Sequence, residues 1–114
     1  PSTDAVSALP GLALAYDLTA AAPAWTADER RIVERDLLLE YIIGAEPFVG
    51  GPGKADNANN KAPRVYNAMA AIAKCLGIPE YADTALRGYE RVRDESFNGD
   101  GMCTESPSYN DMYL

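Results

Sequence analysis

Apolar side chains recur at every third or fourth position along most of the chain, which is the spacing of one face of an α-helix. The longest such run follows Thr26, with arginines and glutamates on its opposite face. Its apolar members are Ile32, Val33, Leu37, Tyr41 and Ile42, with Leu38 and Leu39 widening the stripe. We expect a helix over residues 27–43 that ends at Gly44, because glycine readily takes the left-handed conformation that closes a helix.

The start of this helix has a signature of its own. Thr26-Ala27-Asp28-Glu29 has the form of a capping box. In that motif the Thr26 hydroxyl accepts a hydrogen bond from the Glu29 amide, and the Glu29 carboxylate accepts one from the Thr26 amide. It is the strongest local signal in the chain, and it predicts a helix that begins at residue 27.

A shorter helix is predicted before it. Apolar residues at near-helical spacing run from residue 4 to residue 20, namely Val6, Leu9, Leu12, Ala13, Tyr16 and Ala20. Pro10 interrupts them, and proline is harmless only in the first turn of a helix. We therefore expect a short turn before Pro10 and a helix from Pro10 to about Thr19.

Two further helices are predicted in the second half of the chain. Over residues 60–76 the apolar positions are Val65, Met69, Ile72 and Leu76, at spacings of four, three and four, with Gly77 as the cap. Over residues 80–96, which Pro79 opens, the inward positions are Tyr81, Ala85, Leu86, Tyr89 and Val92, and the outward ones are Arg87, Glu90, Arg91 and Asp94. Each pattern is that of an amphipathic helix.

The connections point to an all-α fold. No segment alternates apolar and polar residues around an Asn-Gly turn, as a β-hairpin does. Consecutive helices with short connections pack as antiparallel hairpins, so the fold class is all-α. The exception is the 45–58 segment with its Gly50-Gly51-Pro52-Gly53 run, since loops of this length are either functional or mobile. The sequence alone does not distinguish a functional loop from a mobile one.

Composition excludes several kinds of partner. The 114 residues include 10 basic and 17 acidic side chains, for a net charge of −7. Bulk electrostatics therefore attract neither nucleic acid nor an anionic membrane surface. No apolar run approaches the ~18 residues of a membrane span. A chain of this length forms one domain at most, and since it begins with Pro1 we expect it to be a piece of a longer protein.

The usual catalytic and metal-binding side chains are scarce. The chain has no histidine, which is the commonest general base and the commonest metal ligand. We expect neither a metal nor a cofactor. Cys75 and Cys103 form no short motif, so they could be bridged or free; we expect them to be unpaired.

The densest group of candidate functional residues follows the last predicted helix. Asn98-Gly99-Asp100-Gly101 predicts a tight reversal, because Asn and Gly tolerate positive φ and Asp bonds its own backbone. Glu105 stands four residues before Tyr109. Ser106-Pro107 has the form of an N-cap followed by a first helical residue. A helix starting there would hold Tyr109 in its first turn.

Three stretches resemble the heparinase II/III-like polysaccharide lyases. The loop from Asp100 to Tyr109 is similar to the family segment in which Asp-Gly is followed by Glu four residues on and then by Ser-Pro-x-Tyr. Asn59-Asn60-Lys61, before a helix that ends in Leu76-Gly77, resembles the family's asparagine-containing helix start. Residues 13–17, followed by residues 26–30, are similar to a helix pair of the catalytic domain. The stretches occur in the family's order and cover most of the chain.

The resemblance implies an architecture. Residues 1–114 would form antiparallel helical hairpins that are part of an incomplete α/α toroid, with the later helices and a C-terminal β-region absent. It also implies a periplasmic or secreted protein whose partner is an acidic polysaccharide or oligosaccharide. Apolar helix faces would be exposed in such a fragment. We therefore expect the isolated chain to be inactive, marginally stable and prone to form homo-oligomers.

The resemblance further implies a reaction. These lyases cleave a uronic-acid-containing chain by β-elimination, in which a base removes the C5 proton and an acid protonates the departing oxygen at C4. The neighbouring carboxylate must be neutralised by donated hydrogen bonds as the enolate develops. On the matching positions, Asn60 is the amide that faces the carboxylate and Tyr109 is the phenol that moves the proton. Tyrosine has an ordinary pKa of ~10, so Tyr109 acts as a base only if that pKa is lowered, or else as an acid.

The neighbours of these two residues are candidates for substrate binding, namely Asn59, Lys61, Arg64 and Glu105. Lys61 departs from the family, which often has a histidine directly after the asparagine. An ammonium can pair with a uronate carboxylate, but it is a poor base unless it is desolvated. Glu105 is better suited to anchoring the loop through Arg64 or an amide than to acid catalysis. Asn60 considered alone is also a good N-cap.

Other functions remain open from the residues. Lys61 would equally mark a non-catalytic carbohydrate-binding or scaffold segment of the same fold. An α/α-toroid glycoside hydrolase would need two carboxylates flanking the bond, and no motif supports Asp100 with Glu105 in that role. Without the resemblance, Tyr109 would be interpreted as a core aromatic at the head of a helix.

Overall fold

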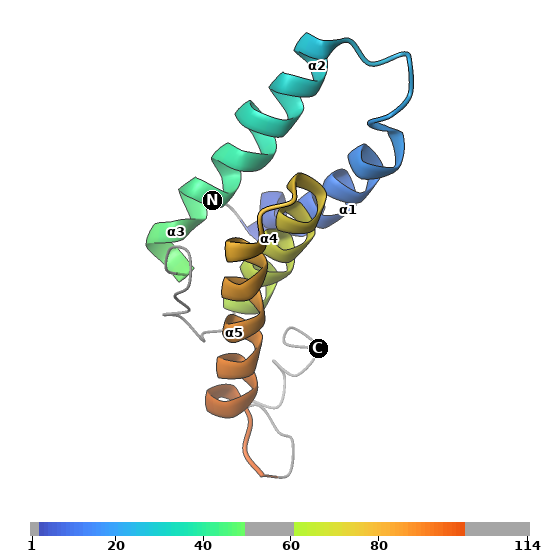
Figure 1. The fold of residues 1–114 in the computed structure, drawn as a ribbon. Helices are drawn as coiled ribbons and strands as arrows, with labels where there is room; N and C mark the ends of the chain where they lie inside the picture. Colours follow the sequence, from blue (N-terminus) through green and yellow to red (C-terminus); the bar gives the residue numbers. More distant parts are fainter. Residues whose placement is uncertain (1–2, 50–60, 100–114) are drawn as a thin grey trace.

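The computed structural model describes residues 3–49 and 61–99, and within these ranges the chain is helical without a strand. The elements are α1 (Thr3–Thr19), α2 (Ala27–Arg31), η1 (Ile32–Leu39), α3 (Glu40–Val49), α4 (Ala62–Leu76) and α5 (Pro79–Ser96). The segments α2, η1 and α3 follow one another as a single long rod (Figure 1). The predicted all-α fold is confirmed.

Helix α4 is the centre of the fold. It packs most extensively against α1 and α5, and it also contacts α3 and η1. Its largest core side chains are Tyr66, Met69 and Ile72, all fully buried. The helix ends at Gly77, whose φ of 68° lies in the left-handed region and whose amide donates to the Ala73 carbonyl. The predicted cap at Gly77 is confirmed.

Helices α4 and α5 form an antiparallel hairpin with a close backbone approach. They are joined by residues 77–78 alone. Gly88 of α5 is buried against the ring of Tyr66, and a Cβ added at Gly88 would lie 2.4 Å from that ring. Position 88 therefore has to be glycine for the two helices to pack at this distance.

The capping box before α2 is present as predicted. The Glu29 amide donates to the Thr26 hydroxyl at 3.2 Å, and the Thr26 amide donates to the Glu29 carboxylate at 2.8 Å. These hydrogen bonds hold the pKa of Glu29 below its ordinary value. The rod therefore begins at Ala27, where the sequence placed it.

Two predicted helix ends are wrong. Helix α1 begins at Thr3 and runs through Pro10 without interruption, and α3 continues past Gly44 to Val49 with Pro47 inside it. In both cases the added turns bury apolar side chains: Val6 and Leu9 in α1, and fully buried Ala45 and Val49 in α3. Burial of a Val or Leu contributes roughly 1.5–3 kcal/mol, which is enough to offset the local preference against proline or glycine.

The predicted apolar stripe of the rod is also wrong in part. Ile32 and Leu37 are 52% and 44% exposed, whereas Leu38 is fully buried. The reason is that η1 is a π-helix of eight residues, whose wider turn brings every fifth side chain to the same face rather than every fourth. On α5, Leu86 is 59% exposed instead of facing inward.

Candidate functional site

The predicted site residues fall mostly outside the part of the chain that the structure describes. Asn59, Asn60, Glu105 and Tyr109 lie in the ranges that are not described, as does Cys103. Lys61 is exposed immediately before α4, and Arg64 is half-buried in the first turn of that helix. The roles assigned to Asn60 and Tyr109 therefore remain predictions.

The α4–α5 hairpin fixes where the two candidate motifs attach. The first motif ends at Lys61, directly before α4, and the second begins directly after residue 99, beyond the end of α5. Because the two helices are antiparallel, the start of α4 and the end of α5 lie toward the same end of the hairpin (Figure 1). The hairpin thus brings the attachment points of two motifs that are about 40 residues apart in the sequence to one end of the fold.

A side-chain contact ties the two helices together near this end. The Tyr89 hydroxyl of α5 donates to the Pro63 carbonyl in the first turn of α4, at 3.4 Å. Helix α5 then continues for seven residues, to Ser96, which at 1.5 Å per residue is about 10 Å beyond this contact. A loop that follows α5 therefore starts past the level of the α4 N-terminus.

The arginines of α5 are largely neutralised by carboxylates of the same helix. Arg87 pairs with Asp83 at 2.9 Å and Arg91 with Glu95 at 2.6 Å, each four residues apart. The hydrogen bond from Arg93 to Asp94 lowers the pKa of that carboxyl. The outer face of α5 is therefore a mixed surface rather than a basic patch, and it offers an acidic polymer no concentrated positive charge.

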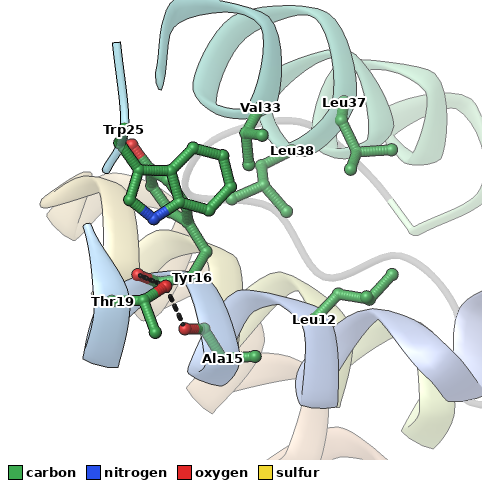
Figure 2. A pocket seen from close by; sticks show the side chains of 8 residues that line it. All are labelled: Leu12, Ala15, Tyr16, Thr19, Trp25, Val33, Leu37 and Leu38. Atoms are coloured by element: carbon green, nitrogen blue, oxygen red, sulfur yellow. Dashed lines mark hydrogen bonds between the residues drawn. The ribbon is translucent and has the colours of Figure 1, made fainter. Parts of the chain in front are cut away.

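A second feature is an apolar groove of about 260 Å³ between α1 and η1 (Figure 2). Leu12 and Tyr16 line it from α1, Trp25 from the connection, and Val33, Leu37 and Leu38 from η1. Leu12 is 50% exposed here, across the groove from Leu37. The groove lacks the convergent polar groups that usually orient a sugar.

Tyr16 joins the two walls of the groove. Its hydroxyl donates to a Glu34 carboxylate oxygen at 2.6 Å, and its ring meets Trp25 edge-to-face with the ring centres 5.5 Å apart. Burial, followed by the hydrogen bond to Glu34, raises the pKa of Tyr16 to about 12. The Tyr16 phenol therefore keeps its proton at ordinary pH and donates it in the hydrogen bond to Glu34, so it does not act as a base.

Arg30 fixes the connection that carries Trp25. Its guanidinium donates to the Ala20 carbonyl at 2.8 Å and to the Ala22 carbonyl at 3.1 Å. Both carbonyls belong to the segment between α1 and α2, so these bonds tie that segment to α2. The sequence analysis did not identify Arg30 as a residue that holds this connection.

A smaller cavity of about 230 Å³ lies between α1 and α4, and Cys75, Asp17 and Lys74 are among the residues that line it. Cys75 is a free thiol. Burial, then the charges of Asp17 and Glu34, raise the pKa of that thiol. A thiol kept protonated in this way is a poor nucleophile.

Comparison of the chain with models of known protein families, with curated proteins and with solved structures finds no match. In residues 3–49 and 61–99, no helix has the length and apolar character needed to cross a membrane. The same residues contain no cluster of three or more side chains suited to hold a metal ion.

Proposed function

We propose that the chain is part of the α/α-toroid catalytic domain of a heparinase II/III-like lyase, which cleaves a uronic-acid-containing glycan by β-elimination. The observation that carries the proposal is the α4–α5 hairpin, which puts the attachment points of the Asn59-Asn60-Lys61 motif and the 100–109 loop at one end. Two motifs that form parts of one active site have to start from the same end of the fold, and the antiparallel arrangement of α4 and α5 supports this.

In this proposal each residue has a separate task. The Asn60 amide donates to the uronate carboxylate and neutralises it while charge develops on the enolate. The Tyr109 phenol transfers the proton between C5 and the departing C4 oxygen. Lys61, exposed at the start of α4, supplies a positive charge to the same carboxylate. Asn59, Arg64 and Glu105 complete the substrate contacts and anchor the loop.

The test uses a protein in which this chain stands within a complete toroid, and a panel of uronate polymers. Release of unsaturated uronate is followed by ultraviolet absorbance. Tyr109→Phe should lower turnover by ~10² or more, the usual contribution of a general acid or base. Asn60→Ala should lower it by ~10² to 10³, as for a lost oxyanion donor.

Tyr41→Phe is the matched control. The Tyr41 hydroxyl is buried and has no hydrogen-bond partner among the described residues, so its removal should leave turnover unchanged. If Tyr109→Phe keeps the turnover of the parent on a polymer that the parent cleaves, the catalytic assignment is wrong.

The alternative is a non-catalytic carbohydrate-binding or scaffold segment of the same fold. The mixed charge of the α5 surface and the lysine at position 61 favour it. Binding of uronate oligosaccharides without release of unsaturated product, in the parent as well as in Tyr109→Phe, would select this alternative.

A further inference from the structure

The buried side chains of the rod keep α-helical spacing through α3 but not through η1. Leu38, Ile42, Ala45 and Val49 are fully buried at spacings of four, three and four. Val33, the preceding residue packed against the core, is five positions before Leu38. An α-helix returns to the same face after three or four residues. Between Val33 and Leu38 the rod therefore contains one residue more than an α-helix needs.

The rod contacts the rest of the fold on both sides of this extra residue. On one side, Glu34 accepts the 2.6 Å hydrogen bond from Tyr16 of α1. On the other side, Leu38 and the buried residues of α3 belong to the core that includes α4. At the end of η1, the Glu40 amide donates to the Arg35 carbonyl, five residues back, and also to the Leu37 carbonyl, three residues back.

We propose that η1 is a two-register switch, with the Tyr16–Glu34 hydrogen bond as its latch. While the latch holds, the extra residue is stored in the π turn. When the latch is released, η1 adopts α-helical hydrogen bonding. Leu37, four residues after Val33, then lies on the same face of the helix as Val33, the position that Leu38 occupies in the π-helical form. Since one residue of an α-helix corresponds to about 100°, α2 and Val33 then rotate by about that angle relative to α3.

This rotation would change the apolar groove. Val33 forms part of the groove wall, and Arg30 holds the connection that carries Trp25. Turning α2 moves Val33 out of the wall and breaks the bonds from Arg30 to the connection. Trp25 would then leave the edge of the Tyr16 ring. Because Trp25 is the only tryptophan in the chain, its fluorescence reports the register.

Glu34 offers a matched pair of variants for the test, because its side chain is exposed and can be replaced without leaving a cavity in the core. Glu34→Ala removes the acceptor of the Tyr16 hydroxyl, whereas Glu34→Gln keeps an oxygen that can accept the bond. In the 114-residue chain, nuclear magnetic resonance couplings across hydrogen bonds identify the carbonyl that pairs with the Glu40 amide.

The parent and Glu34→Gln should show the Glu40 amide bonded to Arg35. Glu34→Ala should show it bonded to Asp36, four residues back, with a shift of Trp25 emission to longer wavelength. If the Glu40 amide stays bonded to Arg35 in Glu34→Ala, the latch does not exist and the proposal fails.

A pair of deletions tests the extra residue independently of the latch. Deleting the exposed Asp36 shortens the spacing from Val33 to Leu38 from five positions to four, so the rod becomes α-helical with its core contacts intact. The thermal unfolding midpoint should change by less than about 5 °C. Deleting the equally exposed Asn67 from regular α4 rotates Met69 and Ile72 out of the core, and should lower the midpoint by more than about 10 °C. Equal losses in the two deletions would refute the extra residue.

Discussion

Two tyrosine–glutamate hydrogen bonds join helices that are distant in the sequence. Tyr16 of α1 donates to Glu34 of η1, and Tyr81 of α5 donates to Glu46 of α3. Each phenol ring is buried while its hydroxyl reaches a carboxylate. Burial, followed by the hydrogen bond to glutamate, raises the pKa of both tyrosines to about 12. The two hydrogen bonds therefore link α1 to η1 and α5 to α3.

The raised pKa values predict a loss of stability in alkali. An unfolded tyrosine has a pKa of ~10, so between pH 10 and pH 12 the unfolded chain releases protons that folded Tyr16 and Tyr81 retain. Stability is therefore unaffected below pH 10 and falls as the pH rises through this window. Thermal unfolding followed by circular dichroism should show a midpoint that falls from pH 10 to pH 12.

The double variant Tyr16→Phe, Tyr81→Phe is the control for this prediction. It lacks both phenols, so its midpoint should fall less steeply over the same window, whatever its absolute stability. The same slope in parent and double variant would show that these two groups do not titrate as assigned.

Substitution by alanine is expected to have opposite effects on stability at two glycines of the chain. A Cβ at Gly88 would lie 2.4 Å from the ring of Tyr66, whereas a Cβ at Gly44 would have nothing within 4 Å. Gly88→Ala should therefore destabilise the chain by about 1–3 kcal/mol through overpacking. Gly44→Ala should stabilise it by about 0.5–1 kcal/mol, because alanine loses less backbone entropy in a helix. Urea denaturation measures both, and a neutral Gly88→Ala would mean that α4 and α5 are not packed this closely.

At the scale of elements, the sequence predicts helices better than it predicts their ends. The capping box at Thr26 and the cap at Gly77 are confirmed because each depends only on a few neighbouring residues. The expected ends at Pro10 and Gly44 are wrong because the helices continue where their side chains are buried against α4. Such contacts join residues that are far apart in the sequence, so the local preferences of proline and glycine do not reveal them.

The π-helix could not be inferred from periodicity alone. The sequence of the rod offers two overlapping apolar stripes, one through Leu37 and one through Leu38, and both fit a helix. Which stripe is buried depends on the contacts at the two ends of η1. Leu37 is 44% exposed whereas Leu38 is fully buried, so the buried stripe runs from Val33 to Leu38, a spacing of five residues.

At the scale of the whole molecule, the candidate site is inferred mainly from the sequence. The motif residues and their proposed chemistry come from the resemblance, and the structure adds the hairpin that carries their attachment points. The groove shows the reverse case. It requires α1 and η1 to lie beside each other, and no local pattern around Trp25 specifies that arrangement.

The chain is extended for its length. Its Cα radius of gyration is 15.2 Å, with extents of 50 × 25 × 20 Å, whereas a compact domain of 114 residues has a radius of about 13 Å. Large apolar side chains remain exposed, among them Leu14 and Leu18 at 59% and 76%. Such surfaces favour contacts between molecules.

The last prediction is that the 114-residue chain self-associates through the groove. Leu12 and Leu37 are about half exposed across it, so covering what remains exposed contributes about half the value of full burial, roughly 0.8–1.5 kcal/mol for each leucine. Sedimentation velocity should show association that increases with concentration, and Leu12→Gln with Leu37→Gln should weaken it by tenfold or more, since a factor of ten is about 1.4 kcal/mol. Leu86→Gln is the control, because Leu86 is 59% exposed on α5 and does not line the groove. A chain that stays monomeric at every concentration, or an equal effect of Leu86→Gln, would contradict association through this surface.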